Sequence, residues 1–337
     1  MKEIFGTLTN GQTANLYTIS CGNITAKIAD IGATLVQLFI PDQNGQLSDV
    51  VLGFDDPAAY IASGTYFGAT VGRNANRVKN ACFVLNNKTW VMPANEGRNS
   101  LHSGPYCFKD RIWEVVSHTP NALILTLHSP HGDQGFPGNA DIRVTYTLEP
   151  DGIRIAYDAV CDQDTVFNFT NHSYFNLAGH DKPEKAMDQI LTMPARFFTP
   201  ADSESIPTGE KRSVAGTPMD FRVPKAIGRD LDADYDALHL QGGYDHNFEV
   251  FCNPCAILSD PESGREMAVY TDCPGVQFYC GNYTDEVGKG GVHYPKRSGI
   301  CLETQFYPDA VNHPEWPQPF CKAGKKYHSE TKYRFTW

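Results

Sequence analysis

The sequence lacks the short motifs that mark several large enzyme classes. It contains no G-x-G-x-x-G after a strand-like run, no phosphate-binding P-loop, no H-E-x-x-H and no G-x-S-x-G. These absences remove the usual sequence support for dinucleotide binding, nucleotide binding, zinc proteolysis and serine hydrolysis.

Long apolar runs and runs of basic residues are missing as well. The most apolar stretch, Ile31 to Ile40, is interrupted by Gly32, Thr34 and Gln37 and is far too short to span a bilayer. With 28 basic and 39 acidic residues, the chain has a formal net charge of −11. Because a polyanion would be repelled by this charge, we expect neither a nucleic-acid partner nor a membrane partner.

The first ten residues lack the apolar core of a secretory signal. The chain contains 10 cysteines, which are scattered along its length. Scattered cysteines in a chain of this length are typical of reduced, mostly buried thiols, so we expect a cytoplasmic location. Cys252 and Cys255 have the spacing of a metal or redox pair, but no second pair lies at a suitable distance. We therefore interpret these two cysteines as structural and expect no metal site.

Helical patterns are few, and strand patterns dominate the chain. Apolar residues alternate strictly along Ile142–Leu148 and Ile153–Tyr157, on either side of Asp151-Gly152, which predicts an antiparallel hairpin with its turn there. Asn44-Gly45 marks a second return of the chain. Further strand candidates are Ala122–Leu127 and Glu266–Tyr270.

Composition points to the same class of fold. The chain has 12% aromatic residues, 29 Gly and 22 Pro, which suits sheets joined by long loops. Short helices are expected only at 56–62, where Asp56 precedes a proline at the first helical position, and at 234–240. We therefore predict an all-β fold, a large antiparallel β-sandwich with few short helices, formed as one domain by residues 1–337.

Five segments place polar or ionisable residues within apolar or glycine-rich surroundings. They are Tyr66–Val78, Asn99–Gly104, Val166–Leu177, Gly243–Phe248 and Ser298–Asp309. The candidate site residues among them are two histidines, two acids, an arginine and several amides. Such a set suits a neutral, polyhydroxylated ligand, whose hydroxyl groups need both donors and acceptors.

Each candidate side chain also has an ordinary explanation. His172 could be a core histidine bonded to the backbone, and Glu303 could be the partner of a buried arginine. Turn, cap or loop positions would account for the other four: Asn76, Arg77, His102 and Asp245. The sequence alone leaves open whether these segments converge in space.

In order and spacing, the segments resemble the motif set of the aldose 1-epimerase (galactose mutarotase) family. The motifs read G-x-x-x-G-R-x-A-N-R, N-x-L-H, T-N-H-S-Y-F-N-L, Y-D-H-N-F, P-G-V-Q-F-Y and L-E-T-Q-x-x-P-D. The resemblance runs from Ser48 to Gln318, nearly the whole chain. It implies a sandwich of the galactose mutarotase type, with a free sugar bound in an open cleft on one sheet.

The resemblance also implies a mechanism that uses no cofactor. Glu303 would act as the general base on the C1 hydroxyl, and His172 as the general acid on the ring oxygen, so that the ring opens and recloses as the other anomer. We expect the carboxylate and the protonated histidine to stabilise each other through their proximity. The residues implied to hold the sugar are Asn76, Arg77, His102, Asp245 and Gln277.

Three alternatives stay open at this point. A non-catalytic sugar-binding sandwich would need similar polar residues but no matched acid and base. A glycoside hydrolase would use paired carboxylates such as Asp245 and Glu303. An epimerase of hexose 6-phosphates would need extra cations for the phosphate, and Arg73 and Arg77 are candidates.

The substrate is expected to be a small aldose. The sequence does not choose between galactose, glucose and another sugar, nor between a monomer and a homodimer.

Overall fold

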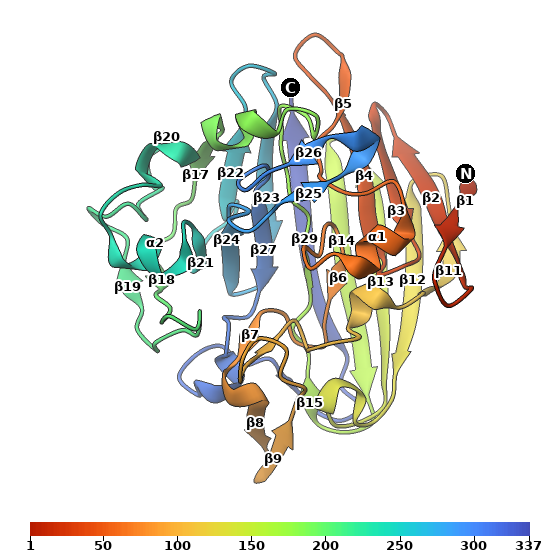
Figure 1. Cartoon of the computed structure of the whole chain (residues 1–337). Helices are drawn as coiled ribbons and strands as arrows, with labels where there is room; N and C mark the ends of the chain where they lie inside the picture. The colour runs from red at the N-terminus through yellow and green to blue at the C-terminus, as the bar shows by residue number, and fades with distance from the viewer.

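The computed structural model describes all 337 residues, and its regular secondary structure consists mainly of β-strands joined by long loops (Figure 1). Only two α-helices occur, α1 (Pro57–Ala62) and α2 (Asp236–Gln241). Every pair of named strands is antiparallel. The predicted all-β class is therefore confirmed.

The largest sheet has nine strands. In spatial order they are β11 (Glu114–His118), β12 (Ala122–Ser129), β13 (Ala140–Glu149), β14 (Gly152–Cys161), β29 (Tyr327–Thr336), β23 (Glu266–Thr271), β22 (Ala256–Ser259), β17 (Ile190–Thr192) and β20 (Lys225–Ala226). The sequence-predicted hairpin is β13–β14, but its turn was placed one residue too late. Gly152 pairs with Glu149, so Pro150 and Asp151 form the two-residue connection and Gly152 already belongs to the second strand.

Two five-stranded sheets complete the framework. The first contains β1 (Lys2–Thr7), β2 (Thr13–Cys21), β3 (Ile24–Ala29), β4 (Thr34–Pro41) and β5 (Leu47–Asp49). The second contains, in spatial order, β19 (Arg212–Ser213), β18 (Phe197–Thr199), β21 (Asp245–Glu249), β24 (Gly275–Tyr279) and β27 (Cys301–Gln305). The predicted return at Asn44-Gly45 joins β4 to β5, where Asp42 Oδ1 accepts the N–H groups of Asn44 and Gln46.

Short two-stranded ladders and short 3₁₀ segments fill the loops. The ladders are β7 (Arg77–Val78) with β10 (Ser100–Leu101), β6 (Thr70–Val71) with β16 (Thr170–Asn171), β8 (Cys82–Leu85) with β9 (Lys88–Val91), β15 (Thr165–Val166) with β28 (Phe320–Cys321), and β25 (Glu286–Val287) with β26 (His293–Tyr294). The 3₁₀ segments are Lys79–Ala81, Phe108–Asp110, Asp133–Gly135, Pro183–Asp188, Ile227–Asp230, Lys289–Gly291 and Ala310–Asn312.

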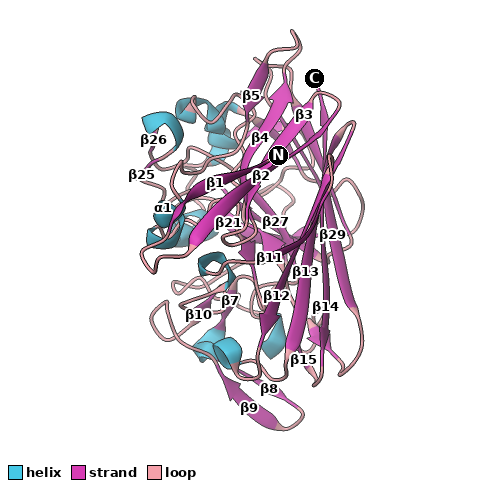
Figure 2. Cartoon of the chain, turned by 90° about the vertical axis from the view of Figure 1, so that its right-hand side faces the viewer, coloured by secondary structure: helices cyan, strands magenta, loops and turns pink.

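The sheets pack face to face around one main core. Figure 2 shows β12, β13, β14 and β29 as one layer, with β21 and β27 to its left. The main core cluster of 54 buried residues draws side chains from all three large sheets, for example Leu35 of β4, Ile155 of β14 and Phe278 of β24. Alternation along each strand turns these apolar side chains inward, which explains why the sequence pattern was informative.

The predicted helix start at Asp56 is confirmed, because Asp56 Oδ1 accepts the N–H of Ala58 and Pro57 opens α1. All ten cysteines are free, and six are buried. Cys252 is exposed, whereas Cys255 is buried in the core. No helix has both the length and the apolar composition needed to cross a membrane.

Arg73 is fully buried beneath the segment that carries two of the predicted site residues. Its guanidinium donates to Ser129 Oγ at 2.9 Å, Pro137 O at 2.8 Å and Gly138 O at 3.0 Å. It also donates to Ser129 O at 2.6 Å. The planar fork thus ties β6 and its following loop to the ends of β12 and β13, and none of its donors is left for a ligand.

We predict that Arg73→Lys lowers the free energy of unfolding by about 3 kcal/mol, because three ammonium protons cannot satisfy these buried acceptors. Urea unfolding followed by tryptophan fluorescence measures the change. Arg143→Lys is the matched control: Arg143 is exposed on β13, and its substitution should cost less than about 0.5 kcal/mol. Equal stability of the two variants would contradict the clamp role of Arg73.

Candidate active site

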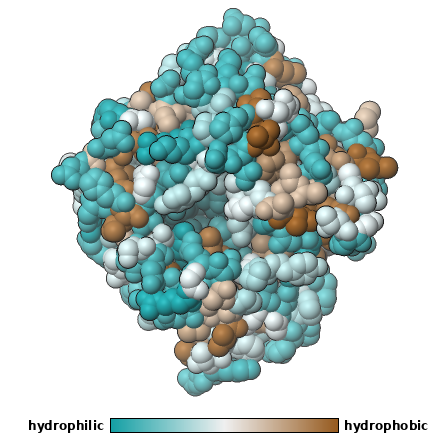
Figure 3. Space-filling model, in the orientation of Figure 1, coloured by the Kyte–Doolittle hydropathy of each residue, from teal (hydrophilic) through white to brown (hydrophobic).

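Six of the seven predicted site residues line one cavity of about 350 Å³. Figure 3 shows the corresponding face of the molecule, which is largely hydrophilic and hollowed near its middle. The lining residues are Gly64, Thr65, Tyr66, Asn76, Arg77, Glu96, Leu101, His102, His172, Tyr174, Asp245, Tyr279, Tyr283, Thr284, Glu286 and Glu303. Gln277 lies beneath this surface, where its Nε2 donates to Asp245 Oδ1 at 2.7 Å.

The floor of the cavity is the polar face of the sheet that contains β21, β24 and β27. Glu303 pairs with Gln277, Gln277 with Asn247, and Asn247 with Thr199, so four polar residues form a row across four strands. Each of the four carries a buried side-chain atom without a protein partner, including Glu303 Oε2 and Gln277 Oε1. A ligand bound in the cavity could supply partners to the atoms of this row that border it.

His172 is positioned by backbone pairing and by the aromatic rings that pack against its side chain. Its N–H donates to Ala69 O at 2.9 Å, and its carbonyl accepts the N–H of Gly68 at 2.9 Å. The ring lies nearly parallel to those of Tyr66 and Tyr174, at centroid distances of 5.9 and 5.1 Å. The imidazole is therefore held between packed elements and points toward β27.

His102 and Asn76 hold each other. The N–H of Asn76 donates to His102 Nδ1 at 3.1 Å, and the N–H of His102 donates to Asn76 O at 3.0 Å. Both residues have positive φ, 52° for His102 and 64° for Asn76, a conformation that costs energy and that clusters at functional sites. Because Nδ1 accepts a backbone N–H, the neutral ring carries its proton on Nε2, so His102 faces the cavity as a donor.

The central contact is between Glu303 Oε1 and His172 Nε2, which are 3.6 Å apart. Both side chains are buried, with residue exposures of 2% for Glu303 and 5% for His172. No arginine bonds Glu303, so the ordinary explanation of this residue as an ion-pair partner is wrong. His172 is likewise more than a core histidine bonded to backbone, because Nε2 faces a carboxylate at the cavity wall.

Burial, not mutual attraction, dominates the ionisation of this pair. Burial lowers the pKa of His172 to about 4. Burial, and then the charge of Asp245, raise the pKa of Glu303 well above its ordinary value, with Arg77 opposing the rise. The expectation that proximity would favour the charged pair is therefore not met, since desolvation penalises both charges.

Arg77 joins the acids at the opposite wall. Its guanidinium donates to both oxygens of Glu96, at 2.6 and 2.9 Å, and its Nη1 lies 3.7 Å from Asp245 Oδ2. Although burial opposes the charge of Arg77, these carboxylates raise its pKa. Burial raises the pKa of Asp245, against the lowering effects of Arg77 and Gln277. The cluster holds a permanent cation within reach of Glu303.

The sequence analysis missed several members of the site. Tyr66, Tyr174 and Tyr279 line the cavity, and Glu96 anchors Arg77. Tyr174 and Tyr279 lie inside the quoted motifs, two residues after His172 and Gln277 respectively, so strand alternation could have placed them on the same face. Glu96 lies in a loop with no periodic signal, and nothing in the sequence pointed to it.

Donor atoms of His102, His172 and Glu303 lie within 4.8 Å of one another, close enough to share a metal ion. The hydrogen bond from the Asn76 N–H to His102 Nδ1 disfavours that use. It occupies one ring nitrogen and leaves the proton on the other, whereas a metal ligand needs a free lone pair. The donor set therefore fits a hydroxyl-bearing ligand better than a metal.

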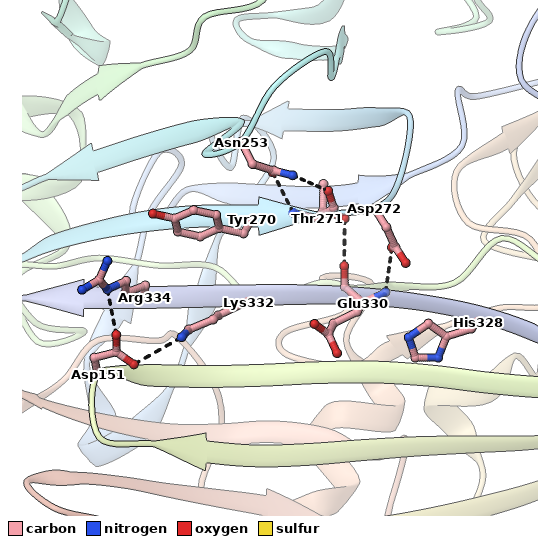
Figure 4. Close-up of a pocket in the computed structure, with 9 residues that line it drawn as sticks. All are labelled: Asp151, Asn253, Tyr270, Thr271, Asp272, His328, Glu330, Lys332 and Arg334. Carbon is pink, nitrogen blue, oxygen red and sulfur yellow. Dashed lines mark hydrogen bonds and ion pairs between the residues drawn. The ribbon is translucent and has the colours of Figure 1, made fainter.

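Two larger concavities lie on the outer face of the nine-stranded sheet. One, of about 590 Å³, is shown in Figure 4: Asp151 pairs with Arg334 at 2.7 Å and with Lys332 at 3.3 Å. The other, of about 810 Å³, lies over β12, β13 and β14. In the concavity of Figure 4 these charged groups form ion pairs with one another at the surface. No buried acid–base pair lines this concavity, so it lacks the features of a catalytic site.

Comparison with known proteins agrees with this geometry. The family model described as aldose 1-epimerase matches residues 15–334. The chain is 40% identical to galactose mutarotase of Bos taurus, with 99% of this chain and 98% of the relative covered, and 36% identical to aldose 1-epimerase of Escherichia coli strain K12, with 97% and 96% covered.

Solved structures give the same result. A Caenorhabditis elegans protein described as an aldose epimerase homologue superposes with a TM-score of 0.89 at 32% identity, covering 96% of this chain and 99% of that one. A galactose 1-epimerase from Lactobacillus acidophilus superposes with a TM-score of 0.87 at 27% identity, covering 100% and 98%. The resemblance seen in the motifs is thus confirmed over the whole chain, and the protein belongs to the aldose 1-epimerase family.

Proposed function

We propose that the protein interconverts the α and β anomers of free aldoses, galactose and glucose among them, by opening and reclosing the sugar ring. The observation that carries the proposal is the buried contact between Glu303 Oε1 and His172 Nε2 at the wall of the cavity. One carbon of the sugar, C1, bears both the hydroxyl and the ring oxygen. An acid and a base side by side can therefore reach both oxygens at once.

Ring opening moves two protons and breaks one bond. Glu303 takes the proton of the C1 hydroxyl, His172 gives its Nε2 proton to the ring oxygen, and the C1–O5 bond breaks to leave an aldehyde. Rotation about C1–C2 presents the other face of the carbonyl. Reclosure runs the transfers backward: Glu303 returns its proton to the carbonyl oxygen, and His172 takes the proton of the O5 hydroxyl.

This cycle uses the burial of the pair. The ring-closed complex needs Glu303 as carboxylate and His172 as imidazolium, whereas the aldehyde complex holds both in their neutral forms. Because burial favours the neutral forms, the site stabilises the state that accompanies the open chain. Arg77 favours the ionised carboxylate and so opposes part of this preference.

The remaining residues are proposed to hold the sugar. His102 would donate from Nε2, Asn76 and Arg77 would bond ring hydroxyls, and Asp245, supported by Gln277, would accept from them. The rings of Tyr66, Tyr174 and Tyr279 offer apolar surface to the sugar faces. The two proton-transfer groups and this positioning supply a complete mechanism without a cofactor.

The alternatives lose support at this site. A hydrolase using Asp245 as its second carboxylate conflicts with the bonds that tie Asp245 to Gln277 and Arg77. A pure binding module has no use for a desolvated acid–base pair. Hexose 6-phosphates are disfavoured by charge: Glu96, Asp245 and Glu286 line the cavity against one cation, Arg77.

We also propose that residues 1–337 form one domain, supported by a main core cluster with members from Tyr17 to Phe335. A cytoplasmic location is supported by ten cysteines that form no disulfide.

Loss of either proton-transfer group should abolish most activity. Glu303→Gln keeps the shape of its side chain, and His172→Asn keeps a planar polar group, so both variants should fold normally. Each should lower kcat by about 10²–10⁴-fold. Polarimetry of freshly dissolved α-D-galactose in dilute buffer measures the rate. The exposed residues Glu262 and His128 provide matched controls, Glu262→Gln and His128→Asn. Near-normal turnover in a folded Glu303→Gln or His172→Asn variant would remove that residue from the mechanism.

The pH profile should follow the shared proton. At low pH the pair takes up a second proton on His172, whose pKa burial lowers to about 4, and no general base is then left. At high pH the pair loses its one proton from Glu303, whose pKa is raised, and no general acid is then left. We therefore expect kcat/KM to stay level through neutral pH, falling on the acid side well below about 6.5, the usual histidine value. An acid limb at that usual value would mean that burial does not control the pair.

Charge at the rim should decide the response to phosphorylated sugars. Galactose 6-phosphate should give a kcat/KM at least about tenfold below that of galactose, because like charges disfavour its binding. Glu286→Lys should narrow this ratio, whereas Glu262→Lys, the same charge change on the exposed surface, should leave it unchanged. A wild-type preference for the phosphorylated sugar would contradict the proposed substrate class.

A further inference from the structure

One strand contacts both ring nitrogens of His172. Glu303 Oε1 lies 3.6 Å from Nε2, and Cys301 Sγ lies 3.6 Å from Nδ1. Cys301 and Glu303 are two residues apart on β27, so strand alternation directs both side chains to the same face. Cys301 is fully buried, and its Sγ is the side-chain partner of His172 Nδ1.

We propose that Cys301 is a positioning residue for the reaction: its sulfur accepts the Nδ1–H of His172 and thereby holds the tautomer whose Nε2 faces Glu303 and the sugar. The inference rests on the proposed function, in which His172 exchanges a proton at Nε2.

The proton balance shows why this tautomer matters. When the imidazolium of His172 gives its Nε2 proton to the ring oxygen, the neutral ring that remains is protonated on Nδ1. Reclosure requires that Nε2 then take a proton back from the O5 hydroxyl. A neutral ring protonated on Nε2 could not accept it, so a partner that stabilises Nδ1–H keeps the histidine ready for the return step.

A thiol suits this position better than a charged group. Burial, and then the negative charge of Glu303, raise the pKa of Cys301, so the sulfur stays a neutral thiol. A neutral sulfur is a weak acceptor and does not stabilise the imidazolium strongly. A carboxylate at the same place would raise the pKa of His172 and oppose release of its proton. Cys301 thus orients the ring without retaining the proton.

The wild-type protein tests the contact directly. Nitrogen NMR of protein labelled with ¹⁵N-histidine distinguishes a protonated from an unprotonated ring nitrogen, and the His172→Asn variant identifies the His172 signals. At neutral pH we expect Nδ1 to be protonated and Nε2 to have the shift of an unprotonated nitrogen. A neutral ring protonated on Nε2 would overturn the proposal, and this readout is independent of epimerase activity.

Variants of Cys301 supply the kinetic test. Cys301→Ala removes the acceptor and should lower kcat about 10-fold while KM changes by less than about twofold. Cys301→Ser keeps an acceptor and should recover kcat to within about threefold of the wild type. Cys255→Ala, which removes a buried thiol from the main core, is the matched control and should keep the wild-type kcat.

The two hypotheses fail in different ways. An unchanged kcat and an unchanged tautomer in folded Cys301→Ala would overturn the role of Cys301 alone. A wild-type protein that does not accelerate anomer exchange would overturn the proposed function, whatever the tautomer. If Cys301→Ala does not fold, Cys301→Ser and the wild-type tautomer decide, because neither requires the alanine variant.

Discussion

The site depends on a single proton held by two buried groups. Glu303 and His172 face each other at 3.6 Å, and burial alone would make each of them neutral. In water the carboxylate and the imidazolium would both be stable, and neither would favour the aldehyde state. Burial away from water instead favours the neutral forms of both groups, and Arg77 opposes this effect at Glu303. The pair can therefore pass its proton in either direction, as a reaction that runs both ways requires.

The sheet beneath this pair carries fixed polar side chains at positions where apolar side chains would give a more stable protein. The inward face of the sheet that contains β21, β24 and β27 carries Phe248, Phe278 and Leu302, and these belong to the main core. Its other face carries the row of polar residues from Thr199 to Glu303, with several unpaired atoms. Unpaired buried atoms cost stability, so the nine-stranded sheet and its large core offset that cost.

Much of this could be predicted from the sequence, because the relevant signals are local. Alternation along Ile142–Leu148 predicted β13, and Asp56-Pro57 predicted the start of α1. The hairpin turn was misplaced by one residue, since Gly152 fits a strand end as well as a turn. The family motifs identified all seven proposed site residues, six of which line one cavity.

Non-local properties could not be predicted. The pairing of Glu96 with Arg77 depends on a loop that returns to β7, and the direction of the pKa changes depends on how much of the chain covers each group. The sequence also did not show which motif arginine is structural and which one faces the ligand. Arg73 is buried as a clamp and Arg77 faces the cavity, although both lie in the same segment.

The most direct test of this account is the protonation state of Glu303 in the free protein. Infrared difference spectroscopy between the wild type and Glu303→Gln, at neutral pH in H₂O and D₂O, isolates the signal of this one carboxyl group. The account predicts the carbonyl band of a protonated acid in the wild type, shifted in D₂O and absent in the variant. A carboxylate band alone would show that the buried pair is charged at rest, and it would contradict the central role of desolvation in the mechanism.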